Sequence, residues 1–429
     1  MNKKTNVLIF PAGEINSMEL HDALSFNVNI EVFGASSVER HGAYVFKNYR
    51  GNLPLISDER FISEFNKLLD EWGIEFIFPT HDTIALFLAE HQKQLKAKVI
   101  VSSIETARIC RDKQETYNLF EQYDFCPKLH KSIEEYPCFI KPRAGQGSVG
   151  AKKIVSEIDI PEDINLDDYV ITEYLPGEEL TVDCLTDSHG KLCAVLPRVR
   201  TRLMAGVSVA GYAFSATEEI NKIAETINSS LNFLGLWYFQ LKQDATGKYK
   251  LLEISVRCAG TMCLSRARGV NLPLLSVYVA QGKDVNVFEN PYQIKMDRTL
   301  ISRYQIDYEY DTVYMDYDDT LVLQQDVCLP AIRFVYQCKN KGKKVVLITR
   351  HNQDHDNSVF DDLHMHYIAE TVFDEIINVE GGQEKTDYIN PQKAIFVDNA
   401  YIERKKVHDR YNIPVFDVEG LEVLCDWHS

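Results

Sequence analysis

The stretch YFQLKQDATGKYKLLEISVRCAGT, residues 238–261, decides how the middle of this chain is expected to fold. Two runs with strand character flank the turn sequence DATGK, which predicts an antiparallel hairpin. Such a hairpin would place Gln240 and Glu253 close together on neighbouring strands. Paired hard oxygen ligands of this kind suit Mg²⁺ that bridges the oxygens of a triphosphate.

Arg257 extends the same pattern beyond the second strand. It lies two pleats after Glu253, so it could share that face and contact a phosphate. The plain alternative is an exposed hairpin that carries a few polar side chains. The hairpin by itself does not separate the two interpretations.

Two further motifs precede the hairpin. In FIKPRAGQGSVGAKKIV, residues 139–155, a lysine ends one strand and a glycine-rich loop returns into another. Glycines let backbone N–H groups approach phosphate oxygens, and the lysine supplies charge. The loop lacks the G-K-[ST] of a Walker A motif, and alone it is also compatible with a simple glycine hairpin. VITEYLPGEELTVDCL, residues 170–185, then predicts a strand, an acidic hinge and a second strand.

In this order and spacing the motifs resemble the ATP-grasp superfamily over roughly residues 1–292. The closest resemblance is to the carboxylate–amine ligases related to biotin carboxylase and the large chain of carbamoyl phosphate synthetase. It implies ATP and Mg²⁺ as cofactors, and a small-molecule carboxylate and an amine as substrates. The implied reaction transfers a phosphoryl group from ATP to the carboxylate, and the amine then displaces phosphate from the acyl phosphate.

The resemblance also implies roles for individual residues. The ATP-binding residues would be Lys113 and Lys141 at the phosphates, Gly145, Gly147 and Ser148 in a phosphate lid, Glu173, Tyr174 and Leu175 at the adenine, and Glu179 at the ribose. Gln240 and Glu253 would hold Mg²⁺, with Arg257 at the transferring phosphate. Arg198 and Arg200 would be candidates for holding the substrate carboxylate or the acyl phosphate.

The metal-binding strand departs from the family pattern at one position. The family sequence is usually Glu-x-Asn-x-Arg, whereas this chain has EISVR with Ser255 in place of the asparagine. Serine is shorter and offers one hydroxyl, which puts a second Mg²⁺ in doubt. The departure also favours, mildly, the alternative of a non-catalytic ATP-grasp ligand-binding module.

The first hundred residues alternate short apolar strands with amphipathic helices. NVLIFPA, NIEVFGA, FIFPT and KVIVSS read as strands, and residues 61–72 and 84–95 read as helices. This alternation predicts a parallel, doubly wound sheet. The loop PAGEIN after the first strand lacks G-x-G-x-x-G, so no dinucleotide site is indicated. Asp82 could either touch a ligand or cap the next helix.

A second acidic signature lies in VYMDYDDTLV, residues 313–322. Residues i and i+2 of a strand face the same way, so Asp316 and Asp318 should project together from its carboxyl end. One carboxylate can attack phosphorus while the other protonates the leaving oxygen and later activates water. A calcium-binding EF-hand is excluded, because Leu321 and Val327 stand where that loop needs glycine and glutamate.

Later motifs support phosphate chemistry. VVLITR ends in Thr349, EKTDYI offers Lys385, and AIFVDNAYIERKK supplies Asp398 and Glu403. Together they resemble the haloacid dehalogenase (HAD) phosphohydrolase superfamily across roughly residues 311–429. The resemblance implies Asp316 as nucleophile, Asp318 as acid/base, Thr349 and Lys385 at the phosphate, and Asp316, Asp318, Asp398 and Glu403 as Mg²⁺ ligands or their supports.

The gaps between these motifs are too short for a separate cap domain, so a capless HAD phosphatase acting on a phosphorylated metabolite is expected. Two alternatives remain: an inert Rossmann-like sheet with acidic strand ends, or a HAD fold kept only as a scaffold. A second alternation of strands and helices begins after residues 290–298, which suggests that this segment links the two halves.

Length and composition set the frame for both halves. The 429 residues suggest two or three domains, with 45% hydrophobic and 25% charged residues, as in soluble globular proteins. The net charge of −17 argues against a nucleic-acid partner, and the longest apolar runs are too short to cross a bilayer. No signal peptide is recognised, so a cytoplasmic protein is expected, with a homodimer among its expected assemblies.

The predicted fold class is α/β and α+β multidomain. It comprises a Rossmann-like pre-ATP-grasp domain over residues 1–107, an ATP-grasp domain over 108–292 and a Rossmannoid HAD domain over 297–429. The expected whole is a bifunctional enzyme with ligase and phosphatase activities.

Overall fold

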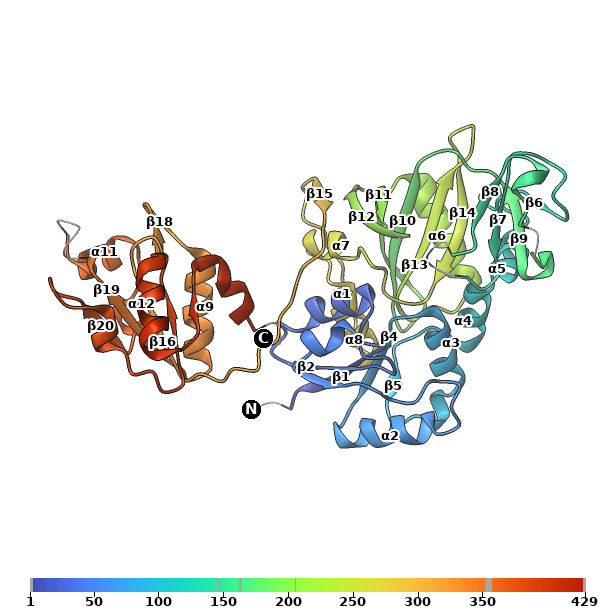
Figure 1. The fold of residues 1–429 in the computed structure, drawn as a ribbon. Helices are drawn as coiled ribbons and strands as arrows, with labels where there is room; N and C mark the ends of the chain where they lie inside the picture. Colours follow the sequence, from blue (N-terminus) through green and yellow to red (C-terminus); the bar gives the residue numbers. More distant parts are fainter. Residues whose placement is uncertain are drawn as a thin grey trace. The chain divides into compact units, whose positions relative to one another are not determined.

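The computed structural model describes residues 3–145, 147, 149–161, 164–204, 206–351 and 357–426. The chain divides into two compact units, Met1–Leu300 and Ile301–Ser429, coloured blue to yellow and orange to red in Figure 1. Within the described ranges no helix has the length and apolar character needed to cross a bilayer.

The first unit begins with a five-stranded parallel sheet in the order β3-β2-β1-β4-β5. Its strands are β1 (Thr5–Phe10), β2 (Ile30–Ala35), β3 (Asn48–Arg50), β4 (Phe76–Pro79) and β5 (Lys98–Val99). Four of them lie in the four runs that the sequence predicts as strands, and the short edge strand β3 is additional. The predicted parallel sheet therefore forms.

Helices cover both faces of this sheet. Alternate residues of β1 point to opposite faces, so neighbouring residues of the strand pack against different helices. Leu8 packs in the same core as α2 (Phe61–Glu71) and α3 (Asp82–Glu90), whereas Val7 packs in another core with α1 (Ile15–Leu24). In α2 the buried residues are Phe61, Phe65, Leu68 and Leu69, which form the single apolar stripe of an amphipathic helix.

Two antiparallel sheets follow the helices α4 (Ile104–Arg111) and α5 (Lys113–Phe120). The smaller sheet has the order β6-β9-β7-β8, with β6 (Leu129–His130), β7 (Cys138–Pro142), β8 (Lys152–Ile154) and β9 (Tyr169–Glu173). The larger has the order β14-β13-β10-β11-β12-β15, with β10 (Glu179–Thr186), β11 (Leu192–Met204), β12 (Val207–Ala213), β13 (Gly235–Gln243), β14 (Tyr249–Ser255) and β15 (Ile294–Asp297). The helices α6 (Glu218–Ser230), α7 (Cys263–Ala267) and α8 (Leu272–Ala280) complete the unit.

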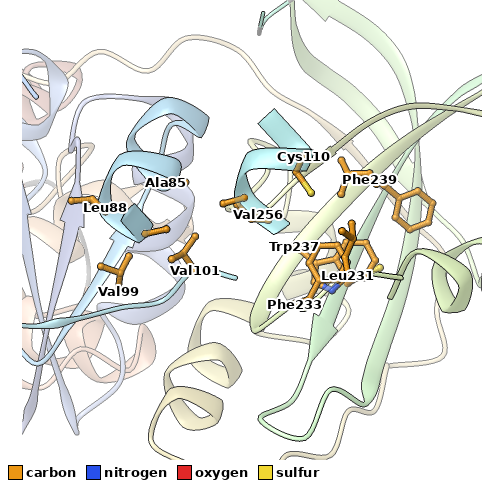
Figure 2. Close-up of a cluster of buried hydrophobic side chains, with 14 of the residues drawn as sticks. Ala85, Leu88, Val99, Val101, Cys110, Leu231, Phe233, Trp237, Phe239 and Val256 are labelled. Carbon is orange, nitrogen blue, oxygen red and sulfur yellow. The ribbon is translucent and has the colours of Figure 1, made fainter. Parts of the chain in front are cut away.

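One hydrophobic core joins the parallel sheet to the large antiparallel sheet. Ala85 and Leu88 of α3 belong to the same cluster as Cys110 of α4 and as Trp237 and Phe239 of β13 (Figure 2). The predicted boundary at residue 107 falls inside α4. The predicted end at 292 leaves out β15, which pairs with β12 at the edge of the large sheet.

The second unit contains another parallel sheet, in the order β20-β19-β16-β21-β22. Its strands are β16 (Thr312–Met315), β19 (Lys344–Thr349), β20 (Glu375–Asn378), β21 (Ala394–Val397) and β22 (Val415–Phe416). The helices α9 (Leu329–Asn340), α11 (Val359–Met365) and α12 (Tyr401–Tyr411) pack with it, and β17 (Val322–Leu323) and β18 (Asp326–Val327) form a small hairpin. The runs TVYMDY, KVVLIT, KAIFVD and IPVFDV are typical of strands, and β16, β19, β21 and β22 form within them; β20 is additional.

Candidate functional site

A cavity of about 380 Å³ lies in the first unit, lined by residues of both antiparallel sheets. The predicted ligase-site residues that line it are Lys113, Lys141, Gly145, Gly147, Glu173, Tyr174, Leu175, Glu179, Arg198, Arg200, Gln240, Glu253 and Arg257. Ser148, the remaining predicted residue, lies outside the described residues. Residues far apart in the sequence, from Lys113 to Arg257, thus line one cavity.

Two buried lysines stand close to one another at this cavity. Lys113 begins α5, whose N-cap Asp112 accepts hydrogen bonds from the backbone N–H groups of Gln114 and Glu115. Lys141 lies on β7, and its Nζ donates to the carbonyl oxygen of Leu252 at 2.9 Å. Lys113 donates to the carbonyl oxygen of Gly145 at 3.0 Å, so it also holds the glycine loop. Burial, and then the charge of Lys113, lowers the pKa of Lys141 to about 7.

This pKa predicts that binding of a triphosphate, the ligand that the sequence leads us to expect, takes up protons. A triphosphate beside Lys141 favours the charged lysine and raises its pKa. Above pH 7 the empty site therefore binds a proton when ATP binds, whereas well below pH 7 Lys141 already carries one. Calorimetry of ATP binding in buffers of different ionisation enthalpy should show proton uptake at pH 8 and little at pH 6. In Lys141→Arg, which stays charged, the pH 8 uptake should disappear; equal uptake in both proteins would contradict the assignment.

The two residues predicted as oxygen ligands lie next to each other. Gln240 of β13 and Glu253 of β14 are direct cross-strand partners, beside a β-bulge at Gln240/Leu241. Glu253 Oε2 lies 3.6 Å from Nζ of Lys113. One carboxylate and one amide at the cavity fit Mg²⁺ that takes its other ligands from phosphate and water. Among the described residues no three His, Cys, Asp or Glu side chains gather as a metal site.

Ser255, the departure from the family pattern, does not line this cavity. Its hydroxyl donates to Oδ1 of Asp82 at 2.5 Å. Arg257 donates from Nε and Nη2 to Oδ2 of the same carboxylate, at 3.0 and 2.8 Å. Asp82 is therefore neither a free ligand nor the cap of α3, because His81 is the N-cap and accepts from the backbone N–H of Thr83.

The two other predicted arginines are also paired. Arg198 is buried and contacts Asp183 through Nη1, while its Nε donates to Thr261 Oγ1 at 2.8 Å. Its Nη2 has no hydrogen-bond partner among the described residues. Arg200 contacts Glu179, the residue implied at the ribose. Arg198 thus lines the cavity and keeps one buried donor that no described residue accepts.

The first unit consists of a parallel sheet followed by two antiparallel sheets, whose residues line a cavity rich in lysine and arginine. A family model described as ATP-grasp in the biosynthetic pathway with Ter operon matches residues 165–300. The first unit therefore contains an ATP-grasp fold. No curated protein sequence matches the chain.

Solved structures share this fold at low identity. N5-carboxyaminoimidazole synthetase from Staphylococcus aureus, complexed with ADP, aligns at 14% identity over 70% of this chain and 83% of its own, with a TM-score of 0.56. Biotin carboxylase from Campylobacter jejuni aligns at 16% identity over 66% of this chain and 72% of its own, with a TM-score of 0.53. Pyruvate carboxylase from Rhizobium etli aligns at 16% identity with a TM-score of 0.55 over 66% of this chain, which spans only 29% of that enzyme.

A second group of predicted residues gathers in the second unit. Asp316 follows β16, Thr349 ends β19 and Asp398 follows β21. Since β16 lies between β19 and β21 in a parallel sheet, the carboxyl ends of the three strands are neighbours. Lys385 is buried and its Nζ lies 2.8 Å from Asp316 and 2.6 Å from Asp398. Burial raises the pKa of Asp316, the charge of Asp398 raises it further, and Lys385 opposes both.

Asp318 has different partners. It accepts a hydrogen bond from Thr349 Oγ1 at 3.3 Å, and its Oδ1 lies 2.7 Å from Nδ1 of His351. His351 is buried, and its Nε2 lies 3.3 Å from Oδ2 of Asp362. None of the sequence motifs predicts His351 as a site residue. Its only signal was its position two residues after Thr349, which alone does not predict contact with Asp318.

The four predicted metal ligands of this unit are not gathered as a metal site among the described residues. Asp316 and Asp398 share Lys385, and Asp318 faces Thr349 and His351. Glu403 lies 3.4 Å from Lys406 and 4.0 Å from Arg350. The assignment of these residues as Mg²⁺ ligands or their supports stays a prediction.

Proposed function

We propose that the first unit is an ADP-forming ligase that joins a small-molecule carboxylate to an amine. The observation that carries the proposal is the single cavity that brings Lys113, Lys141, Glu253 and Arg257 to one place, with an unused donor on Arg198. Cations around a triphosphate neutralise the charge of the transferring phosphoryl group. Mg²⁺, when bound, would add charge neutralisation at the same oxygens.

Each of these cavity residues has a separate role in the proposed reaction. Lys113 and Lys141 bind the phosphates of ATP, and Glu253 and Gln240 face them as the residues that would hold Mg²⁺. Arg257 orients the transferring phosphoryl group. Arg198, through Nη2, holds the carboxylate that attacks phosphorus. The carboxylate becomes an acyl phosphate with release of ADP, and the amine then expels phosphate and loses a proton.

The test is a screen of carboxylic acids and amines for ADP release, with products identified by mass spectrometry. Acid-dependent ADP release and a conjugate with the mass of acid plus amine minus water support the proposal. Nucleotide binding without turnover for any pair would instead favour the non-catalytic binding module. Absence of nucleotide binding would reject both interpretations.

We propose that the second unit is a phosphohydrolase that acts on a phosphomonoester. The family match ends at residue 300, so this proposal is supported by the geometry of the second unit alone. Asp316 attacks phosphorus while Asp318 gives a proton to the leaving oxygen, and Lys385 neutralises phosphoryl charge. Asp318 then takes a proton from the water that hydrolyses the aspartyl phosphate. His351 and Thr349 orient Asp318. A screen of phosphate esters for released phosphate tests the proposal, and failure with every ester would favour a scaffold.

A further inference from the structure

Asp82 connects two parts of the first unit that lie far apart in sequence. It begins α3, yet both its oxygens are engaged by the end of β14, 173 and 175 residues later. Only 16% of its side chain and 11% of that of Arg257 are exposed. Burial raises the pKa of Asp82, but the charge of Arg257 and the hydrogen bond from Ser255 outweigh it and lower the pKa. The carboxylate is therefore a charged, three-bond anchor.

Arg257 is held from more than one side. Nε and Nη2 donate to Asp82, and Nη1 donates to the carbonyl oxygen of Cys258 at 3.0 Å. Its guanidinium carbon lies 5.4 Å from the centre of the Tyr238 ring. An arginine side chain otherwise has large rotamer freedom. These contacts hold the Arg257 side chain in one orientation at the cavity that it lines.

The helix that carries Asp82 is itself fixed. Ala85 and Leu88 of α3 lie in the core shared with the large antiparallel sheet (Figure 2). The next residue, Thr83, accepts from Arg111 Nη2 at 3.1 Å, and Arg111 Nη1 lies 3.4 Å from the carbonyl oxygen of Gly145. The first turn of α3 therefore contacts the end of β14 directly and the glycine loop through one arginine.

We propose that Asp82 is a positioning residue of the ligase site, which holds Arg257 in the orientation that contacts the transferring phosphate. The inference rests on the proposed ligase function, because it needs a triphosphate in the cavity. A guanidinium fixed before substrate binds loses little freedom when it meets the phosphate, which is the advantage of a preorganised site. Ser255 serves the same anchor, since its hydroxyl satisfies the other oxygen of Asp82.

Nucleotide binding by Asp82→Asn tests the proposal. Calorimetry should compare Mg²⁺–ADP with Mg²⁺ and a non-hydrolysable ATP analogue. Because Arg257 acts on the terminal phosphate, the analogue should bind about tenfold more weakly, since a charge-assisted hydrogen-bonded anchor is lost. ADP affinity should change by less than about twofold. If Asp82 had only a structural role, its replacement would weaken the binding of both nucleotides equally, and this result would overturn the proposal.

The matched control is Asp58→Asn. Asp58 also pairs with an arginine, Arg60, at 2.7 Å, but 31% of its side chain is exposed and it does not line the cavity. Its loss should leave both affinities unchanged. Ser255→Ala removes only the hydroxyl and gives a second variant if Asp82→Asn does not fold. There the preference for triphosphate over diphosphate should fall about twofold, as for one hydrogen bond, and an unchanged preference would overturn the proposal.

A double variant tests whether Asp82 acts through Arg257. Adding Asp82→Asn to Arg257→Lys should lower ligase kcat/KM by less than about twofold beyond Arg257→Lys alone, because coupled residues are not additive. Additive losses would show that Asp82 acts elsewhere. If the wild-type protein bound neither nucleotide, the proposed function itself would fail. If the wild-type protein bound both nucleotides and Asp82→Asn bound both equally more weakly, only the role of Asp82 would be overturned.

Discussion

Glu253→Ala is expected to lower the ligase rate by roughly 30- to 900-fold, which corresponds to a loss of about 2–4 kcal/mol of transition-state stabilisation. Glu253 faces Gln240 across β13 and β14 and lies 3.6 Å from Lys113. Its removal takes away the carboxylate that would hold Mg²⁺ and the partner of Lys113, the lysine that we propose at the phosphates. The measurement is acid-dependent ADP formation at saturating ATP, with the substrates found by the screen.

The control for this variant is Glu218→Ala in the first turn of α6, where 82% of the glutamate side chain is exposed. It should keep wild-type activity. Lys141→Ala should fall in the same range as Glu253→Ala, because it removes a single charge from the same site. Full ligase activity of Glu253→Ala with every productive substrate would show that the metal assignment is wrong.

Asp316→Asn is expected to abolish phosphomonoester hydrolysis, with a loss on the order of 10⁴-fold or more, as when a nucleophile is removed from other covalent-catalysis enzymes. Asp316 is buried at the end of the central strand β16, 2.8 Å from Lys385. An amide there cannot form the aspartyl phosphate. ATP-dependent ligation should be unaffected, because the ligase cavity is lined entirely by residues of the first unit.

Phosphate release from the ester that the wild-type protein hydrolyses, measured beside ADP release in the same preparation, checks both statements. Asp409→Asn is the matched control, since Asp409 is an exposed carboxylate on α12 that pairs with Lys405. Trapping of phosphate on a residue other than Asp316, or phosphatase activity retained in the variant, would reject the assignment of the nucleophile.

Local sequence patterns predict much of the architecture. The hairpin over residues 238–261 forms with Gln240 opposite Glu253, because strand periodicity and turn chemistry are properties of neighbouring residues. The same holds for the parallel strands that end beside Asp316, Thr349 and Asp398. The short strands β3 and β20 were missed, since a few residues paired at or near the edge of a sheet carry little local signal.

Domain limits were harder to predict from sequence. The core that includes Leu88 and Trp237 crosses the predicted boundary at residue 107, and β15 lies beyond the predicted end at 292. Burial of apolar surface between elements far apart in the chain joins them into one unit, and such burial has no marker at the junction itself.

The residue types of the lysines and their places at element starts and ends, the pairing of Gln240 with Glu253 and the acidic strand ends were determined by the sequence itself, because each depends on a few adjacent residues. Their partners were decided only by the tertiary structure. Asp82 meets Ser255 and Arg257 across 173 and 175 residues, and His351 meets Asp318 across 33. A buried carboxylate takes whichever donors the packing of its helix brings within reach, and that packing is a property of the whole fold.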